Sequence, residues 1–281
     1  MLYFQSWSGG KDSTASIILE HIHGLPRSTI IFSEVMFDKQ RGISGEIPEH
    51  IDWVRNTAIP IFKQWGHEVR ILHADTDYLD WFYRVLKTSK VPERIGKIYG
   101  FPIGHFCKIN SAVKIKPIND FYKQITDAFI QYVGIAVDEP ERLARMQGTN
   151  RISLLERYGY TEQMAFELCK DYDLLSPVYA FTKRGGCWFC PNSGIAEYAH
   201  IKQIYPHLWA ELEKLSHAKN LCVQKFRYSK TFEEVNNSVD AFIEKERIKH
   251  LQITLEEWSG ENDPKHLDKR RCPNGSPANG S

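Results

Sequence analysis

One six-residue segment near the start of the chain, Ser8–Ser13 (Ser-Gly-Gly-Lys-Asp-Ser), constrains the fold more than any other. The apolar run Leu2–Trp7 leads directly into it, and a helical pattern follows from Thr14 to His23. A strand that ends in a glycine pair and opens a helix directs several backbone N–H groups to one point, at the positive end of the helix dipole. The segment therefore predicts a polyphosphate cradle at a strand–turn–helix junction.

The side chains of this segment suit the same purpose. The two glycines permit positive φ and the close approach of an anion. Ser8 and Ser13 add hydroxyl donors, and Lys11 can neutralise phosphate charge. Asp12 or Ser13 can cap the helix. The spacing differs from the Walker A pattern, so another kind of phosphate loop is predicted, the alternative being a plain glycine turn.

Residues 1–180 alternate apolar runs with helical patterns, which is typical of a parallel sheet covered by helices. The expected strands are Leu2–Trp7, Thr29–Phe37, Glu68–His73, Phe129–Val137 and a short one at Ile152–Leu155. The expected helices lie near Asp12–His23, Pro48–Trp65, Tyr78–Leu86 and Thr161–Tyr172. Three prolines, Pro48, Pro117 and Pro140, are each expected at the start of a helix, where their fixed φ is suitable.

The pattern changes after about residue 180, where strand signals end. Amphipathic helices are expected near Gly194–Ile204, Pro206–Ala218 and Thr231–Lys249. We therefore expect an α/β domain over residues 1–180, a helical C-terminal module over 181–260, and a flexible tail over 261–281 that is rich in Gly, Pro, Asn and Ser.

The composition, with 42% hydrophobic and 25% charged residues, is that of an ordinary globular protein. The formal net charge is only +1, so nucleic-acid binding would need a local basic face that the total hides. No run approaches the ~18 apolar residues of a membrane span, and no signal peptide is visible. We expect a cytoplasmic protein with no membrane association, whose six cysteines serve metal or redox chemistry rather than disulfides.

A C-x-x-C turn, Cys187 to Cys190, opens the C-terminal module. Two thiolates can hold one metal ion from such a turn, but a structural zinc takes four ligands. Cys107 and Cys222 are the candidate partners, and His105 is a spare ligand or acid–base group. The alternative is an inert turn with reduced cysteines.

Other charged residues cluster near expected strand ends and helix starts. Lys114 and Lys116, with Lys108, could bind phosphate or sulfate, the alternative being a solvated basic helix end. Glu34 and Asp38 close the second apolar run and could bind ribose hydroxyls or Mg²⁺.

The acids Asp138 and Glu139 follow a buried strand, at the sheet edge where open α/β folds bind ligands. The alternative is that they are ordinary first-turn acids of a helix.

Three stretches resemble known sequences. Ser8–Ser13 resembles the pyrophosphate loop of the N-type ATP pyrophosphatases (the PP-loop or adenine nucleotide alpha hydrolase superfamily). Cys107, followed by Lys-Ile-Lys-Pro-Ile, is similar to a segment of the phosphoadenosine phosphosulfate (PAPS) reductase branch. Residues 134–142 resemble that branch's Gly-Ile-Arg-x-Asp-Glu…Arg stretch, with Ala136 in place of the arginine. The resemblance covers residues 1–180 and the start of the C-x-x-C.

The resemblance implies a Rossmann-like (HUP-type) twisted parallel sheet, with ATP across the carboxyl ends of the first two strands and Mg²⁺ held by acids. The expected nucleotide-binding residues are Ser8, Gly9, Gly10, Lys11, Asp12, Ser13, Glu34, Asp38, Lys114, Lys116, Gly134 and Arg142. The expected catalytic residues are Lys11, Asp12, Asp138, Cys187 and Cys190. The expected metal ligands are Cys107, Cys187, Cys190 and Cys222.

Members of this superfamily cleave ATP to AMP and pyrophosphate to adenylate an acceptor, or bind adenylyl sulfates. The first hypothesis is an adenylating transferase that acts on an acceptor such as tRNA or DNA, with its cysteines holding a 4Fe-4S cluster, which three cysteines can bind, or alternatively Zn²⁺. A sulfur donor or reductant protein and a second copy of the chain are candidate partners. The alternatives are an oxidoreductase acting on adenylyl sulfate and a non-catalytic nucleotide-binding module. Against the oxidoreductase, the tail has only Arg-Arg-Cys272-Pro where assimilatory reductases carry Glu-Cys-Gly-x-His.

Overall fold

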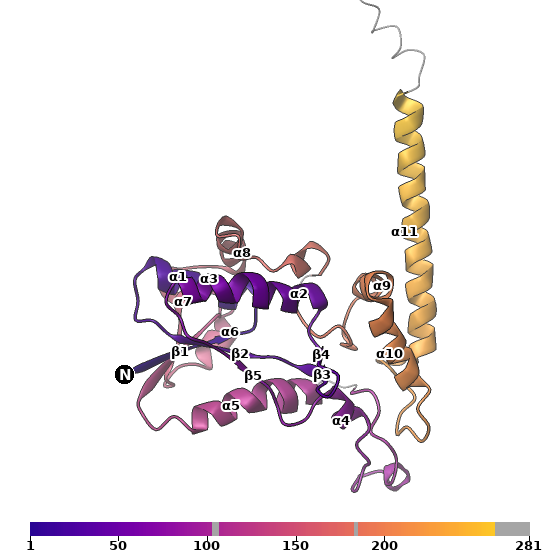
Figure 1. The fold of residues 1–281 in the computed structure, drawn as a ribbon, viewed down its shortest axis with the longest axis horizontal. Helices are drawn as coiled ribbons and strands as arrows, with labels where there is room; N and C mark the ends of the chain where they lie inside the picture. Colours follow the sequence, from indigo (N-terminus) through magenta and orange to yellow (C-terminus); the bar gives the residue numbers. More distant parts are fainter. Residues whose placement is uncertain (103–106, 183–184, 262–281) are drawn as a thin grey trace, which may run out of the picture.

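The computed structural model describes residues 1–102, 107–182 and 185–261. Within them, five parallel strands form a central sheet in the order β5-β2-β1-β6-β7 (Figure 1). The strands are β1 (Leu2–Trp7), β2 (Thr29–Ser33), β5 (Val69–Leu72), β6 (Phe129–Val133) and β7 (Arg151–Ser153). The predicted α/β class with an all-parallel sheet flanked by helices is confirmed.

The strand order reverses beside the central strand. From β1 the chain adds β2 and then β5 on one side, and later adds β6 and β7 on the other. The connections after β1 and β6 therefore leave in opposite directions, which makes the carboxyl ends of these two strands a topological switch point. The loops that follow β1 and β6 both lie at this switch point.

Helices cover both faces of the sheet. On one face lie α1 (Lys11–Ile22), α2 (Pro48–Trp53), α3 (Ile59–Gln64), α7 (Leu154–Tyr158) and α8 (Glu162–Asp171) (Figure 1). Their apolar side chains, such as Ile17, Phe62 and Leu154, pack around Trp7 of the central strand. On the other face, α5 (Lys116–Lys123) packs its aromatic residues against Phe4.

Two predicted strands end earlier than expected. Thr29–Phe37 was expected as one strand, but β2 stops at Ser33 and the chain enters a hairpin of β3 (Met36–Asp38) and β4 (Ile43–Ser44). The Gly45 N–H donates to the Val35 carbonyl (2.7 Å), which turns this backbone out of the parallel sheet. Similarly, β6 ends at Val133, not Val137.

Two helices contain π-helical turns, each followed by a proline. The turn η1 (Val54–Ala58) precedes Pro60, and η3 (Asn110–Ile115) precedes Pro117. A proline cannot donate to the carbonyl four residues earlier, so the preceding turn widens. Pro117 is the second residue of α5, as predicted for a proline at a helix start, but α5 continues directly from η3 and from a helical segment that begins at Lys108.

The C-terminal part is helical, as predicted, with α9 (Ile195–Ile204), α10 (Pro206–Ser216) and α11 (Phe232–Glu261). It shares its core with the first part of the chain, because Trp188 packs on Phe37 and Phe189 on Tyr78. The smaller elements are α4 (Tyr78–Phe82), η2 (Pro92–Arg94), α6 (Pro140–Ala144) and η4 (Pro177–Ala180). The predicted helix to Leu86 thus ends at Phe82, and the expected tail beyond residue 261 lies outside the described residues.

Among the helices in the described part of the chain, none has both the length and the apolar character needed to cross a membrane.

Candidate functional site

The segment Ser8–Gly10 joins the carboxyl end of β1 to the first residue of α1. Gly9 has φ +72°, and a Cβ there would stand 2.5 Å from Nε2 of His50. Gly10 has φ −76°, so only one of the two glycines uses the positive φ that both permit. A Cβ on Gly10 would stand 3.3 Å from the Ser8 hydroxyl and 3.6 Å from that of Tyr179.

The serine hydroxyls hold the loop in shape. The Ser13 hydroxyl accepts from the Ser8 N–H (3.3 Å) and lies 3.1 Å from the Gly10 carbonyl. The N-cap of α1 is Gly10, without a side-chain cap, so the expected capping by Asp12 or Ser13 is wrong. The Lys11 N–H donates to the Tyr179 hydroxyl (2.9 Å), a polar contact that the sequence did not indicate.

Two acidic residues, from α1 and α8, hold the side chain of Lys11. Its ammonium lies 2.7 Å from the Asp12 carboxylate and 2.9 Å from that of Glu162. Burial alone would lower the pKa of Lys11, but these carboxylates outweigh it and raise that pKa. Burial raises the pKa of Asp12. Asp138 accepts from the Glu162 N–H (3.1 Å), so Glu162 links Asp138, through its backbone, to Lys11, through its side chain.

The loop after β6 contacts the start of α1 through Gly134. A Cβ there would stand 2.5 Å from the carbonyl carbon of Asp12, so any larger residue would press on Ser8–Ser13, the predicted phosphate loop. This close packing by itself explains why residue 134 is a glycine, without any role in ligand binding. Arg142, further along, is half exposed and forms an ion pair with Glu139.

His50 lies buried beneath the loop. Its Nε2 is 3.3 Å from the Ser8 carbonyl oxygen and its Nδ1 is 2.8 Å from the Ser176 hydroxyl. Because a carbonyl can only accept, Nε2 carries the proton and Nδ1 accepts from Ser176. Burial lowers the pKa of His50, which favours this neutral form. The sequence analysis missed this residue, since a histidine on an apolar helical face has no distinguishing pattern.

The predicted acids after β2 are both held by cations of the chain. The Glu34 carboxylate, fully buried, accepts from Arg55 (2.8 Å) and His73 (3.0 Å). Burial would raise the pKa of Glu34, but these hydrogen bonds lower it. Asp38 pairs with Arg41 (2.5 Å) and lines a separate cavity of about 240 Å³. No hydrogen bond or ion pair within the described residues joins Asp38 to Ser8–Ser13. The expected role of Asp38 in nucleotide binding stays a prediction.

Three of the four predicted cysteine ligands line one cavity of about 590 Å³, which we call the cysteine cavity: Cys107, Cys187 and Cys190. Cys222 is not among its lining residues; its backbone N–H donates to the Ile98 carbonyl instead. Within the described residues, no three His, Cys, Asp or Glu side chains are arranged to hold a metal ion. His105 lies outside the described residues. The predicted four-cysteine ligand set therefore stays a prediction, with three of its members at one cavity.

A lysine–glutamate pair borders this cavity. Lys114 lines it and lies 3.4 Å from the buried Glu46, whose backbone pairs with Cys187 in an isolated β-bridge. Burial would lower the pKa of Lys114, but Glu46 outweighs it and raises that pKa. Burial, with Glu46 in addition, raises the pKa of the Cys187 thiol well above its ordinary value, against the effect of Lys114.

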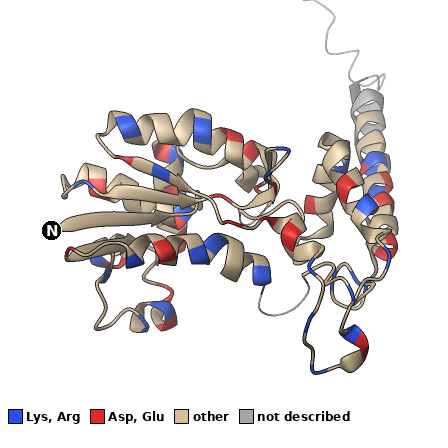
Figure 2. Cartoon of the chain, turned by 60° about the horizontal axis from the view of Figure 1, so that its bottom comes forward, with Lys and Arg blue, Asp and Glu red and all other residues tan. Residues whose placement is uncertain are grey.

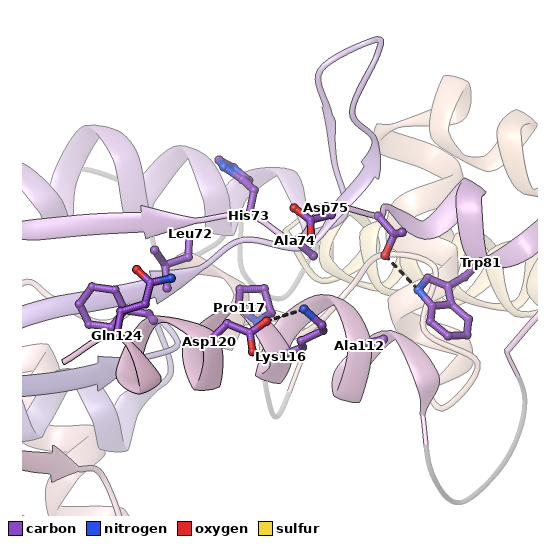
Figure 3. A pocket seen from close by; sticks show the side chains of 12 residues that line it. Leu72, His73, Ala74, Asp75, Trp81, Ala112, Lys116, Pro117, Asp120 and Gln124 are labelled. Atoms are coloured by element: carbon purple, nitrogen blue, oxygen red, sulfur yellow. Dashed lines mark hydrogen bonds and ion pairs between the residues drawn. The ribbon is translucent and has the colours of Figure 1, made fainter. Parts of the chain in front are cut away.

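Lys116, expected to act with Lys114, lies on another face of the helix. It lines a second cavity, of about 550 Å³, at the carboxyl end of β5 (Figure 3). There it pairs with Asp120, below His73 and Asp75. Trp81 closes one end of this cavity, and its indole N–H donates to Thr76 (3.2 Å). The two lysines therefore serve different cavities.

His50 connects the phosphate loop to the cysteine cavity. A Cβ on Gly185, which lines the cavity, would stand 3.8 Å from the same imidazole that lies against Gly9. The two predicted sites are thus neighbours across one buried side chain.

No protein-family model matches this chain, and no curated protein matches it significantly.

Proposed function

We propose that this chain is a PP-loop enzyme similar to the PAPS reductase-like branch, with a HUP-type fold, which cleaves ATP to AMP and pyrophosphate to adenylate an acceptor. The observation that carries the proposal is the position of Ser8–Ser13. The segment joins the central strand to α1 at the point where the strand order reverses. That is where open α/β sheets bind nucleotides.

The loop fits the phosphates of ATP. A Cβ on Gly10 would meet only the hydroxyls of Ser8 and Tyr179, so no side chain at Gly10 blocks the approach of an anion to the N-terminus of α1. The N-cap residue Gly10 provides no side-chain cap for the first turn of α1. The Lys11 N–H donates to the Tyr179 hydroxyl, whose place a phosphate oxygen would take. For Lys11 to contact a phosphate, its ammonium must leave Asp12 and Glu162.

For Mg²⁺, the structure favours Asp12 and Asp138 over Glu34 and Asp38. Mg²⁺ bound with ATP needs only one or two protein carboxylates, because phosphates and water supply the other ligands. Asp12 contacts the Lys11 ammonium directly, and Asp138 accepts from the backbone of Glu162, whose carboxylate contacts the same ammonium. The two acids therefore belong to a cluster that already holds one positive charge. Glu34 and Asp38, by contrast, are neutralised by Arg55 and Arg41.

Gly10→Val tests the proposal. The variant keeps an ordinary φ but puts side-chain atoms beside Ser8 and Tyr179, so calorimetric titration should show at least a tenfold loss of ATP affinity with an unchanged melting temperature. Wild type should release AMP and pyrophosphate from labelled ATP. If the variant keeps its affinity for ATP, Ser8–Ser13 is only a structural turn and does not bind phosphate. Gly9→Val is unsuitable, because its side chain would meet His50.

The cysteine cavity is the proposed place of the acceptor chemistry. Cys107, Cys187 and Cys190 line this cavity but are not arranged as metal ligands in the described structure, so they would have to move together to hold a metal. A 4Fe-4S cluster would then supply sulfur chemistry, whereas Zn²⁺ would only stabilise the structure. Anaerobic purification followed by metal analysis and visible absorption tests this. Cys190→Ser should lose the metal, whereas Cys222→Ser, outside the cavity lining, should retain it; a metal-free wild type would contradict the proposal.

A second candidate, an adenylyl-sulfate oxidoreductase, is favoured by one arrangement: Lys114, which could bind a sulfate group, lines the same cavity as Cys187. Incubation with labelled PAPS and a thiol reductant distinguishes the two. Release of sulfite supports the oxidoreductase, and release of AMP from ATP supports the adenylating enzyme.

A further inference from the structure

An exposed arm follows α4, which we define as the basic arm (Tyr83–Tyr99). Its two sides pair in antiparallel fashion: the Leu86 N–H donates to the Lys97 carbonyl (2.9 Å), and the Tyr99 N–H donates to the Arg84 carbonyl (2.8 Å). The arm therefore has a defined backbone, although most of its side chains are exposed to solvent.

A second segment, the basic loop (Ala218–Lys230), lies alongside the base of this arm (Figure 1). The Ile98 N–H donates to the Asn220 carbonyl (2.9 Å), and the Cys222 N–H donates back to the Ile98 carbonyl (2.7 Å). The Asn220 side chain also reaches the Gly96 carbonyl (3.1 Å). Segments more than 120 residues apart in sequence thus form one continuous surface.

This surface concentrates positive charge. The whole chain has 36 basic and 35 acidic residues, but the basic arm and basic loop together contain a single acid, Glu93. Their basic residues, which we call the basic surface, are Arg84, Lys87, Lys90, Arg94, Lys97, Lys219, Lys225, Arg227 and Lys230. In the part of the chain that the structure describes, none of them is in an ion pair with a carboxylate. Figure 2 shows this end of the molecule carrying lysine and arginine on its loops.

Aromatic side chains accompany the charges. Tyr83 and Tyr228 are about half exposed, at 45% and 51%. The Arg84 guanidinium lies over the ring of Trp81, 4.9 Å from its centroid. Cations that neutralise phosphates, interleaved with rings on which bases stack, are typical of surfaces that bind single-stranded nucleic acid. An acidic protein would need the cations but not the exposed rings.

The basic surface also leads to the cysteine cavity. The Arg227 guanidinium donates to the Ser193 carbonyl (3.3 Å), and Ser193 lines that cavity three residues after Cys190. A strand lying along the basic surface would therefore pass the rim of the cavity in which acceptor chemistry is proposed.

We infer that the basic surface binds the sugar–phosphate backbone of a single-stranded nucleic-acid segment and brings one of its bases to the cysteine cavity. The binding is independent of ATP, whereas the delivery of a base as acceptor rests on the proposed function.

The test is fluorescence anisotropy with the full chain and end-labelled 20-nucleotide single-stranded RNA and DNA, at several salt concentrations. The variant K87Q/K90Q/R94Q removes three charges from the exposed arm. We expect at least a tenfold loss of affinity and a salt slope (log K against log salt) smaller by about 2, since each phosphate contact on a single strand contributes about 0.7. Whichever of RNA and DNA binds more tightly identifies the source of the strand.

The matched control is K63Q/K245Q/K249Q, which removes the same charge from exposed positions on α3 and α11. It should bind like wild type. An equal loss in both variants, or none in either, overturns the inference. Binding to vesicles containing phosphatidylserine without binding to either nucleic acid also overturns it, in favour of a membrane surface.

Calorimetric titration with ATP separates this inference from the proposed function. K87Q/K90Q/R94Q should bind ATP like wild type, because the arm does not contact the phosphate loop. If wild type binds nucleic acid but not ATP, the inference about the basic surface is supported and the proposed enzymatic function is contradicted. If wild type cleaves ATP but does not bind nucleic acid, the proposed function is supported and the inference is contradicted.

Discussion

At the scale of single residues, neighbouring glycines have different physical roles. Gly9 needs its positive φ and its lack of a side chain above His50, whereas Gly10 has an ordinary φ. Gly134 is needed for close packing of β6 on α1. Glycine thus permits a positive φ at one position, leaves space for a ligand at another, and lets two backbone segments pack closely at a third, according to its surroundings.

Gly134→Ala should lower the free energy of unfolding by about 1–3 kcal/mol, because the new methyl group would overlap backbone atoms of Asp12 and Ser13 that cannot move aside freely. Urea denaturation without ligand measures the effect. Gly186→Ala is the control, since a Cβ there meets nothing within 4 Å, and should stay within about 0.5 kcal/mol of wild type. Equal stabilities of the two variants would contradict this packing role.

His50 should make stability depend on pH. Its pKa is lowered by burial, so the unfolded chain takes up this proton more readily than the folded protein. The contribution of the neutral His50 to the free energy of unfolding is complete above the ordinary histidine pKa of about 6.5. It falls as the pH decreases below that value, by at most about 1.4 kcal/mol per pH unit. Denaturation of wild type and His50→Gln at pH 7.5 and 5.5 should show the wild-type advantage shrinking at pH 5.5.

The comparison with His50→Gln is needed because Glu20 acts in the opposite sense. Burial raises the pKa of Glu20 to about 7, so its contribution is lost as the pH rises from about 4.5 towards 7. Both proteins contain Glu20, and its effect cancels in the difference. A difference that is the same at both pH values would show that His50 does not titrate as inferred.

At the scale of elements, the helix formed by η3 and α5 separates two lysines that are two residues apart. Lys114 faces the cysteine cavity and the buried Glu46, and Lys116 faces the cavity beneath β5. Positions i and i+2 on a helix point in different directions, and the wide turn before Pro117 does not change this. One basic segment therefore serves two surfaces.

Lys114→Ala should lower the free energy of unfolding by about 1–3 kcal/mol, because it leaves the Glu46 carboxylate buried without its cation. Lys116→Ala should leave it nearly unchanged, since the pair of Lys116 with Asp120 is exposed to solvent. Thermal denaturation of both variants tests the contrast. Restoration of stability in Lys114→Ala by Glu46→Gln would confirm the pairing, and equal effects of the two lysines would refute it.

At the scale of the whole molecule, the two predicted domains share a hydrophobic core. Phe37, Tyr78 and Phe82 from the first part pack with Trp188 and Tyr198 from the second. A parallel sheet that is covered by helices over only part of its length leaves apolar surface at its carboxyl edge, and the C-terminal helices cover it here.

A chain ending at residue 180 should therefore fail to fold stably, because it would expose Phe37, Tyr78 and Phe82 to water. Size-exclusion chromatography and circular dichroism should show aggregation or loss of cooperative melting. A chain ending at Lys249 is the control: it keeps Val235 and Val239, which α11 contributes to this core, and should melt like the full chain. A well-folded monomer of residues 1–180 would show that the domains are independent.

The sequence by itself determined the local structure and the fold class. Apolar runs identified the parallel strands, amphipathic patterns identified the C-terminal helices, and the glycine pair located the junction of β1 and α1. These signals could be interpreted from the sequence because they depend only on residues that are neighbours in the chain. The sequence could not determine that β2 ends at Ser33, or that Glu34 is held by Arg55 and His73, which come from two other parts of the chain. The tertiary structure alone decided which cysteines share a cavity, placed His50 beneath the phosphate loop, and joined two basic segments into one surface. These contacts connect residues far apart in sequence, and their energies are set by burial and distance in the folded chain, for which no local pattern exists.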